Sequence, residues 1–310
     1  IIMKVALFGG TGFVGKYITD ELLNNGHIPL LLVRPGSENK VSRANDCTLN
    51  IGDISDKEII ENTIKESDAI IYNIGLIRQY PKKGITFEKT HFEGAKCCID
   101  IAKEIGVKRF ILMSANGVKY DGTKYQSTKF LADQYLKNSN LNWTIFRPSL
   151  IFGDPKGTIE FCTQLRNDML NLPLPAPLFF EKLNVINAGK FSMSPIHITD
   201  VAKCFVKCIE MENTFEKIYN LGGPYSYNWI ELIDTISKAS EKNKWKIPAP
   251  VEPIKMAAMM LEWLPIFPIT KDQLTMLLEG NTCNSRTAFD EFDIQPTEFT
   301  VENLSYLSAN

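Results

Sequence analysis

The sequence has no long apolar run, no basic tract interleaved with aromatic residues and no pair of cysteines at metal-binding spacing. No apolar stretch approaches the roughly 20 residues that a membrane-spanning helix needs. The 34 lysines and arginines nearly balance the 36 aspartates and glutamates, so neither a nucleic acid nor an anionic bilayer is implied as a partner. Because no signal peptide precedes the first apolar run, we expect a protein of the cytoplasm or an organelle matrix.

Patterns of metal ligands are missing as well. The seven cysteines are scattered and include no Cys-x-x-Cys pair, which fits a reducing compartment and a role in core packing. The three histidines, His27, His91 and His197, show no ligand spacing. We therefore predict no metal site.

The first half of the chain alternates regularly between apolar runs and helical patterns. At 310 residues the chain is long enough for one large α/β domain with a smaller lobe. Such alternation predicts a doubly wound parallel sheet with helices on both faces. The expected strands are 4–8, 28–33, 47–50, 68–73, 110–113 and 143–146, and the expected helices are 13–24, 56–64, 87–105 and 129–137.

The first expected strand runs into a glycine-rich turn, Gly9-Gly-Thr-Gly-Phe-Val-Gly15. A pyrophosphate can approach a backbone only where no Cβ intrudes, and a helix that follows directs N–H groups and its positive dipole end at the phosphates. An ordinary tight turn would also use glycines, but the flanking strand, helix and second strand complete a βαβ unit. We therefore predict a dinucleotide site. Its expected contacts in this turn are Gly9, Thr11, Gly12, Phe13, Val14 and Gly15.

The residue after the second strand distinguishes NAD from NADP. Arg34 stands there, where an acidic residue would bind the NAD ribose, so NADP(H) is favoured over NAD(H), although a solvated surface arginine is the simpler interpretation. Asp53, with Ile54 beside it, is placed to accept a hydrogen bond from the adenine amino group or else to cap the next helix. Asn73 and Gly75 end the fourth strand, where a residue without Cβ indicates a backbone close to the cofactor or a plain turn.

Tyr125-Gln-Ser-Thr-Lys129 is the candidate for chemistry. Residues four apart share a helix face, so the Lys129 ammonium is expected to lower the pKa of the Tyr125 phenol, which is near 10 when free. Tyr120 and Lys124 have the same spacing, but Gly122 between them disfavours a helix. We predict that Tyr125 transfers a proton, and that Lys129 tunes it and holds the nicotinamide ribose.

Together these motifs resemble those of the short-chain dehydrogenase/reductase superfamily, in its extended and atypical, epimerase/dehydratase-like branches. The later segments 195–202, 219–224 and 264–274 are most similar to bacterial relatives of the dehydrogenase-like accessory subunit of respiratory complex I. The resemblance implies a Rossmann-like domain with a small C-terminal lobe and an active-site pair of Tyr125 and Lys129. It also implies that Pro148 and Ile151 lie by the nicotinamide.

The alternation of strands and helices breaks after Pro148, where a proline-rich passage follows. We therefore predict a dinucleotide-binding Rossmann-like domain over residues 1–152 and a substrate lobe formed mostly by residues 153–310. Segments near 195–223 are expected to return to the first domain.

The superfamily's third catalytic residue, a serine or threonine after the fifth strand, is only partly matched. The chain reads Met113-Ser-Ala-Asn116 at this place. Ser114 or Asn116 is a candidate donor to a substrate oxygen, and a structural strand-end hydroxyl is an equal interpretation of Ser114.

The sequence is compatible with several functions. The favoured one is an NADP(H)-dependent oxidoreductase acting on a small carbonyl or alcohol of quinone or isoprenoid type, because the runs 172–180 and 254–267 are apolar, although such runs more often pack in a core. A nucleotide-sugar epimerase or dehydratase would need arginines for the pyrophosphate, and only Arg166 and Arg286 follow Pro148.

Two further functions involve no turnover. One is that of a protein that holds NADP(H) and serves the assembly or stability of a membrane complex, such as a respiratory complex, in peripheral contact with it. The second is that of a redox-sensing regulator. The oligomeric state has no signature in the sequence.

Overall fold

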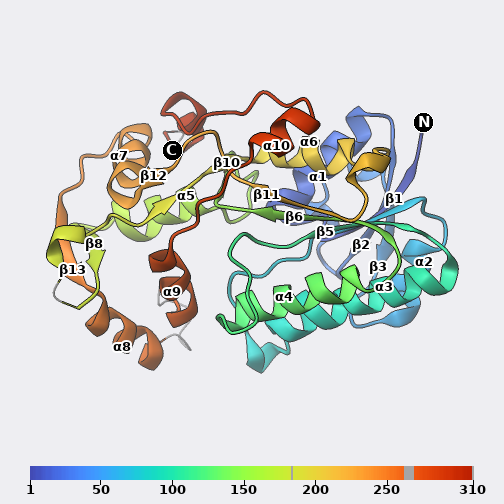
Figure 1. Ribbon diagram of the computed structural model, residues 1–310, viewed down its shortest axis with the longest axis horizontal. Coiled ribbons are helices and arrows are strands. Elements are labelled where there is room, and N and C mark those ends of the chain that lie inside the picture. The colour runs from blue at the N-terminus through green and yellow to red at the C-terminus, as the bar shows by residue number, and fades with distance from the viewer. Residues whose placement is uncertain (183, 262–268, 309–310) are drawn as a thin grey trace. The chain divides into compact units, whose positions relative to one another are not determined.

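The computed structural model describes residues 1–182, 184–261 and 269–308 (Figure 1), and the chain divides into two compact units. Each unit has its own cluster of buried apolar residues. Unit 1 comprises Ile1–Pro148, Ile198–Leu221 and Arg286–Gln295. Unit 2 comprises Ser149–His197, Gly222–Ser285 and Pro296–Asn310.

Unit 1 is built on a seven-stranded sheet whose neighbouring strands are all parallel, in the order β11-β6-β5-β4-β1-β2-β3. The central strands are buried along nearly their whole length, as expected for a sheet covered on both faces. The predicted fold class, a Rossmann-like α/β fold, is confirmed. The strands are β1 (Lys4–Phe8), β2 (Ile28–Val33), β3 (Thr48–Ile51), β4 (Ala69–Tyr72), β5 (Arg109–Met113), β6 (Asn142–Pro148) and β11 (Lys217–Leu221).

Helices cover both faces of this sheet, with α2, α3 and α4 on one side and α1, α6 and α10 on the other (Figure 1). The predicted helix 87–105 begins as a π-helical segment, η4, and continues as α3. The predicted helix at Lys129 begins earlier, because Thr123 and Gln126 form a capping box before it. The segments are α1 (Phe13–Asn24), α2 (Lys57–Ile64), η4 (Glu88–Glu93), α3 (Gly94–Ile105), α4 (Lys124–Lys137), α6 (Ile198–Lys207) and α10 (Arg286–Glu291).

The strand order of unit 1 reverses beside β1. β1 pairs with β2 on one side and with β4 on the other, and the helix after β1, α1, lies on the opposite face from the helix after β4, α3. In open α/β sheets, ligands bind outside the carboxyl ends of the strands at such a reversal. The glycine turn after β1 and the segment after β4 lie at this place.

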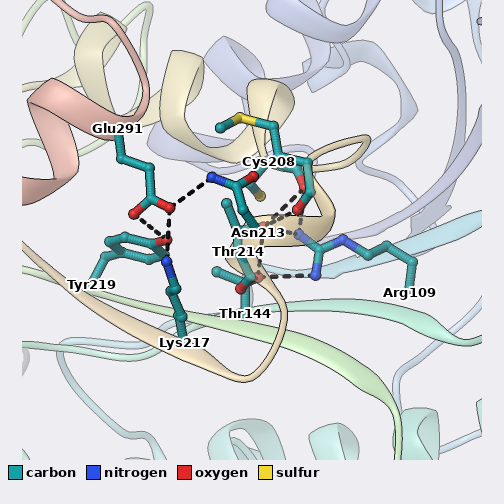
Figure 2. A network of polar contacts seen from close by, with 9 residues as sticks. Arg109, Thr144, Cys208, Asn213, Thr214, Lys217, Tyr219 and Glu291 are labelled. Atoms are coloured by element: carbon teal, nitrogen blue, oxygen red, sulfur yellow. Dashed lines mark hydrogen bonds and ion pairs between the residues drawn. The ribbon is translucent and has the colours of Figure 1, made fainter.

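A buried arginine joins the later segments of unit 1 to the sheet (Figure 2). Arg109 begins β5 and is 5% exposed. Its guanidinium donates to the carbonyl oxygens of Cys208 and Ile209, just beyond the end of α6, where helix carbonyls lack partners. It also donates to Thr144 Oγ1 at 2.9 Å and Thr214 Oγ1 at 3.0 Å. One side chain thus connects β5, β6 and the link from α6 to β11.

A second group of contacts attaches α10 to β11, the edge strand of the sheet. The Glu291 carboxylate accepts hydrogen bonds from Tyr219 Oη at 2.7 Å, and from Lys217 Nζ and Asn213 Nδ2 at 2.8 Å (Figure 2). These contacts return residues 286–295 to unit 1, a return that no sequence pattern indicated.

Unit 2 consists of short strand pairs and helices around Trp229, which is 2% exposed and stacks against Phe179 and Phe191. The pairs are β7 with β10, β8 with β13 and β9 with β12. The strands are β7 (Ile151–Phe152), β8 (Ala176–Phe180), β9 (Ser192–Met193), β10 (Ile196–His197), β12 (Tyr227–Asn228) and β13 (Lys246–Pro250). The helices are α5 (Phe161–Leu165), α7 (Trp229–Ala239), α8 (Val251–Leu261) and α9 (Lys271–Glu279).

The methionine-rich run 254–267 lies partly on α8. Met256, Met259 and Met260 are 66%, 57% and 71% exposed, whereas Ile254 packs on the cluster of unit 2. The preferred interpretation of these methionines as core residues is therefore wrong, because they share the outer face of the helix. Residues 262–267 of this run lie outside the described residues.

Candidate functional site

The glycine turn after β1 forms a cradle of bare backbone. Gly9 has a φ of +98°, which favours glycine, and Gly12 N donates to its carbonyl oxygen at 3.3 Å. A Cβ on Gly15 would lie 2.0 Å from that same oxygen, so only glycine lets α1 pack this closely on the turn. Gly12 is the N-cap of α1 and supplies no capping side chain. The first turn of α1, with Phe13 and Val14, therefore opens on backbone alone, which fits a pyrophosphate.

The segment after β4 adjoins this cradle. A Cβ on Gly9 would lie 3.0 Å from the carbonyl atoms of Asn73. The Asn73 Oδ1 atom is buried and accepts no hydrogen bond within the described part of the chain. A buried amide oxygen without a donor is costly, so it fits a ligand that donates a hydrogen bond there. Farther along, a Cβ on Gly75 would lie 3.8 Å from Lys129 Nζ. The structure thus brings together Gly9, Asn73, Gly75 and Lys129.

The adenosine end of the predicted cofactor site is more open. Arg34 follows β2 and is exposed, and its carbonyl oxygen accepts a hydrogen bond from Ser37 N at 3.0 Å. Asp53 Oδ1 accepts hydrogen bonds from Ser55 N at 3.0 Å and Ser55 Oγ at 2.8 Å. The interpretation that Asp53 caps the next helix is wrong, because Asp56 is the N-cap of α2. Asp53 instead holds the turn before it.

Tyr125 and Lys129 lie one turn apart on α4, and Lys129 Nζ is 5.7 Å from the centroid of the Tyr125 ring. The capping box at Thr123 starts the helix just before this pair. Tyr120 lies ahead of the cap and is 73% exposed. The two Tyr-x-x-x-Lys motifs therefore differ in structure, and only the second lies on one helix.

Burial shifts both members of this pair away from their ordinary pKa values. Lys129 is 4% exposed, and burial lowers its pKa to about 8, against an opposing effect of Asp133. Tyr125 keeps part of its surface exposed, and burial of the rest raises the pKa of its phenol to about 12. This shift is opposite to the lowering expected from Lys129. Lys129 Nζ instead donates to the carbonyl oxygen of Met113, at the end of β5, at 3.0 Å.

His91, to which the sequence assigned no role, supports Tyr125. Its ring stacks on Phe87 and meets the edge of the Tyr125 ring at a centroid distance of 5.2 Å. Leu76 N donates to His91 Nε2 at 3.0 Å, so the ring proton resides on Nδ1, which contacts Thr128 Oγ1 at 3.1 Å. Burial lowers the pKa of His91 to about 2, so the imidazole is neutral. The signal available in the sequence was that Phe87 and His91 are four apart in a helical pattern.

Ser114 occupies a buried setting after β5. Its backbone N donates to Phe146 O at 2.8 Å, and Asn116 N donates to Pro148 O at 2.9 Å, which extends the ladder between β5 and β6. Ser114 is 2% exposed, and its Oγ makes no hydrogen bond of good geometry in the described residues. Burial raises the pKa of the Asp133 carboxyl, and Ser114 lies close enough to oppose that shift, as Arg147 does. The next residue, Ala115, has no hydroxyl that could take the place of Ser114 as a catalytic donor.

The last two predicted contacts fall in different units. Pro148 is buried at the end of β6 in unit 1. Ile151 belongs to β7 of unit 2, where it pairs with Ile196. Its contact with a nicotinamide stays a prediction.

The described residues offer neither a metal-ligand cluster nor a membrane-spanning helix. Over the described ranges, no three His, Cys, Asp or Glu side chains are grouped so as to hold a metal ion. Within the same ranges, no helix is both long and apolar enough to cross a bilayer. All seven cysteines are free, and Cys98, Cys162, Cys204 and Cys208 are buried.

Two known proteins with similar sequences are named as a subunit of an oxidoreductase and as an assembly factor. The mitochondrial 40 kDa subunit of NADH-ubiquinone oxidoreductase from Neurospora crassa is 23% identical over 98% of this chain and 78% of its own length. Photosystem II assembly factor Ycf39 from Synechocystis is 21% identical over 96% of this chain and 88% of its own. The resemblance to the accessory subunit of complex I is thereby confirmed.

Among solved structures, the UDP-glucose 4-epimerase of Thermus thermophilus in complex with NAD superposes with a TM-score of 0.73 at 17% identity, over 99% of this chain and 98% of that one. This likeness shows the fold alone. A family model described as NAD(P)H-binding matches residues 9–169. Since this match covers more than half of the sequence, from the glycine cradle through α4 to α5, the chain belongs to the NAD(P)H-binding family.

Proposed function

We propose that this chain holds NADP(H) in unit 1 and acts as a cofactor-loaded accessory or assembly factor of a membrane redox complex. The proposal rests on a contrast between the cofactor-binding part of the site and its catalytic part. The cradle at Gly9 and Gly15 is complete, whereas the strand-end hydroxyl expected for catalysis is buried beside Asp133. Relatives named as a subunit of NADH-ubiquinone oxidoreductase and as a photosystem II assembly factor support the same assignment.

Each part of the site has an assigned task in this proposal. Backbone N–H groups at the start of α1 bind the pyrophosphate, and Arg34 pairs with the 2′-phosphate of NADP(H). Lys129 and Asn73 bind the nicotinamide end from the carboxyl edge of β4 and β5. Asp53 and Ile54 contact the adenine. When bound, the cofactor supplies a hydride.

A second candidate is the reduction of a small, apolar carbonyl compound of quinone or isoprenoid type. The pairing of Tyr125 with Lys129 on one helix face favours it. Because the phenol has a pKa of about 12, it is protonated at neutral pH, so Tyr125 would act as a proton donor to the carbonyl oxygen. This direction corresponds to reduction. Asn116 is then the donor for the same oxygen, in place of Ser114.

A nucleotide-sugar substrate gains no support beyond the fold. Arg166 Nη1 donates to Leu307 O at 2.6 Å, and its Nε donates to Asn167 Oδ1 at 3.2 Å. Arg286 lies in unit 1 and pairs with Asp290 at 3.8 Å. The first of these guanidinium groups is thus already engaged within unit 2.

We further propose that unit 2 is the lobe that contacts the substrate or partner, and that the chain works in the cytoplasm or an organelle matrix in peripheral contact with the complex. The exposed methionine face of α8 belongs to this lobe.

The test begins with the dinucleotide that co-purifies with the full chain, identified by mass spectrometry, and continues with calorimetry of NADPH and NADH. We expect NADPH to co-purify and to exchange slowly. Replacing Arg34 with Gln should reduce the preference for NADPH roughly tenfold, since it removes a charge-assisted pair.

A panel of carbonyl compounds should not oxidise the bound NADPH. Turnover that disappears in Tyr125→Phe would replace the first candidate with the second.

Two glycine variants distinguish an effect on stability from an effect on NADPH binding. Gly15→Ala places a Cβ 2.0 Å from Gly9 O and should abolish binding together with stability. Gly12→Ala meets Gly9 O at 3.6 Å, an ordinary contact, so it should fold normally and still bind NADPH at least tenfold more weakly, because the phosphates lose room. Unchanged NADPH affinity in Gly12→Ala would show that the glycine turn does not bind the cofactor.

A further inference from the structure

A buried carboxylate lies one helical turn beyond Lys129. Asp133 on α4 is 0% exposed, and Arg147 of β6 donates to it with Nε at 2.9 Å and Nη2 at 2.8 Å. Both bonds reach the same oxygen, Oδ2. The second oxygen, Oδ1, makes no hydrogen bond of good geometry in the described residues, and Ser114 lies close to the carboxyl group.

The hydrogen bonds around Asp133 differ from those expected of a purely structural ion pair. A buried carboxylate is strongly destabilising unless it is paired and hydrogen-bonded, and a structural ion pair is expected to satisfy both oxygens. Here Arg147 is itself only 21% exposed in its side chain and binds one oxygen. The remaining cation near Asp133 is Lys129, which has only Met113 O as a hydrogen-bond acceptor among the described residues.

We propose that Asp133 is a positioning residue for Lys129: clamped by Arg147, its carboxylate keeps the buried ammonium charged and directed along the end of β5 toward the cofactor. This inference rests on the proposed function in one respect, that Lys129 contacts the cofactor. Asp133 itself touches neither cofactor nor substrate. Ser114 then serves the carboxylate, which accounts for its burial.

The charges around Lys129 favour this role. Tyr125 and Asp133 lie on its own helix, His91 faces it from η4, and Arg147 faces Asp133 from β6. Tyr125 and His91 are neutral near pH 7, so Asp133 is the anion among them. Burial lowers the pKa of Lys129 to about 8 even with Asp133 present. Without that anion the pKa falls further, and Lys129 loses its charge at neutral pH.

The binding experiment compares NADPH affinity from pH 6 to pH 9.5 in the full chain, Asp133→Asn and Lys129→Met. Wild-type affinity should fall as pH rises through about 8, where Lys129 loses its proton. Asp133→Asn should move this midpoint down by about one unit, so that affinity is roughly threefold lower at pH 7.5, roughly tenfold lower at pH 9.5 and near wild type at pH 6. Equal weakening at every pH, or an unmoved midpoint, would overturn the proposal.

Two further variants keep the result interpretable. Asp133→Asn leaves Arg147 without its partner, so the double variant Asp133→Asn/Arg147→Gln removes both charges and should show the same shift of the midpoint. Asp133→Glu keeps the charge and should restore the wild-type midpoint even where packing weakens binding overall.

A second measurement needs no cofactor. Urea unfolding of the two single variants and of Lys129→Met/Asp133→Asn gives the coupling between the side chains. At pH 7 we expect the change that Lys129→Met makes in the folding equilibrium constant to be roughly tenfold less favourable in the wild-type background than in Asp133→Asn. This coupling should vanish above pH 10. Absence of coupling at pH 7 refutes the inference, whereas coupling without any NADPH binding refutes only the proposed function.

Discussion

The two ends of strand β5 hold buried cations in opposite situations. At the amino end, Arg109 donates to the five acceptors Asn142 O, Thr144 Oγ1, Cys208 O, Ile209 O and Thr214 Oγ1. Figure 2 shows Arg109 with Thr144, Cys208 and Thr214. At the carboxyl end, the ammonium of Lys129 has one hydrogen-bond acceptor, Met113 O, in the described chain. The two side chains are 5% and 4% exposed, so burial alone does not distinguish them.

The difference between them is one of saturation. A cation whose donors are all used by backbone and hydroxyl groups holds elements together and has nothing left for a ligand. An ammonium with unused N–H groups is unfavourable in the apoprotein and becomes favourable when a ligand accepts them. In the function that we propose, the amino end of β5 serves stability and the carboxyl end serves binding, as expected for an open α/β sheet.

The largest effect should come from Arg109→Met, which leaves five acceptors without their donor. We expect a loss of about 3–5 kcal/mol in the free energy of unfolding, because buried polar groups are left unpaired. Urea denaturation measures it, with Lys108→Met, an exposed neighbour, as the control near zero. A loss below about 1 kcal/mol would show that the network in Figure 2 does not anchor α6 and β11.

Lys129→Met, by contrast, should change how the free energy of unfolding depends on pH. The pKa of Lys129 is about 8 in the folded chain and about 10.5 unfolded. Between these values the unfolded state binds more protons, so wild-type stability rises with pH across this window. We expect a gain on the order of 2–3 kcal/mol between pH 8 and pH 10 that Lys129→Met lacks. Parallel pH curves for both proteins would place the lysine in solvent.

The smallest effect concerns His91, which is buried like Arg109 but neutral. At pH 7, His91→Phe should lower the free energy of unfolding by about 2 kcal/mol, because Leu76 N loses its acceptor. The folded pKa of about 2 lies below the unfolded value of 6.5, so wild-type stability falls as pH drops below 6.5. The two proteins should therefore become equally stable near pH 5. A difference that grows on acidification would mean that the imidazole is charged in the fold.

The local parts of this molecule follow from the sequence. β1, β2 and α1 have the predicted bounds because an apolar run, a glycine turn and an amphipathic helix are adjacent in the chain. The spacing of Tyr125 and Lys129 is also local, since one helical turn places both on one face. The site residues themselves stay predictions until a dinucleotide is measured.

The remaining features were decided by contacts between distant residues. His91 beneath Tyr125, Arg147 on Asp133 and Glu291 at the sheet edge join segments far apart in the chain, so no local pattern indicates them. The direction of the Tyr125 pKa shift likewise depends on how far the fold encloses the ring, and the exposure of Met256 depends on what the fold leaves uncovered. The sequence by itself determined which elements form, because their signals are short-range. The charge and burial of the side chains were decided only by the tertiary structure, since the packing of remote segments sets the solvation of each group.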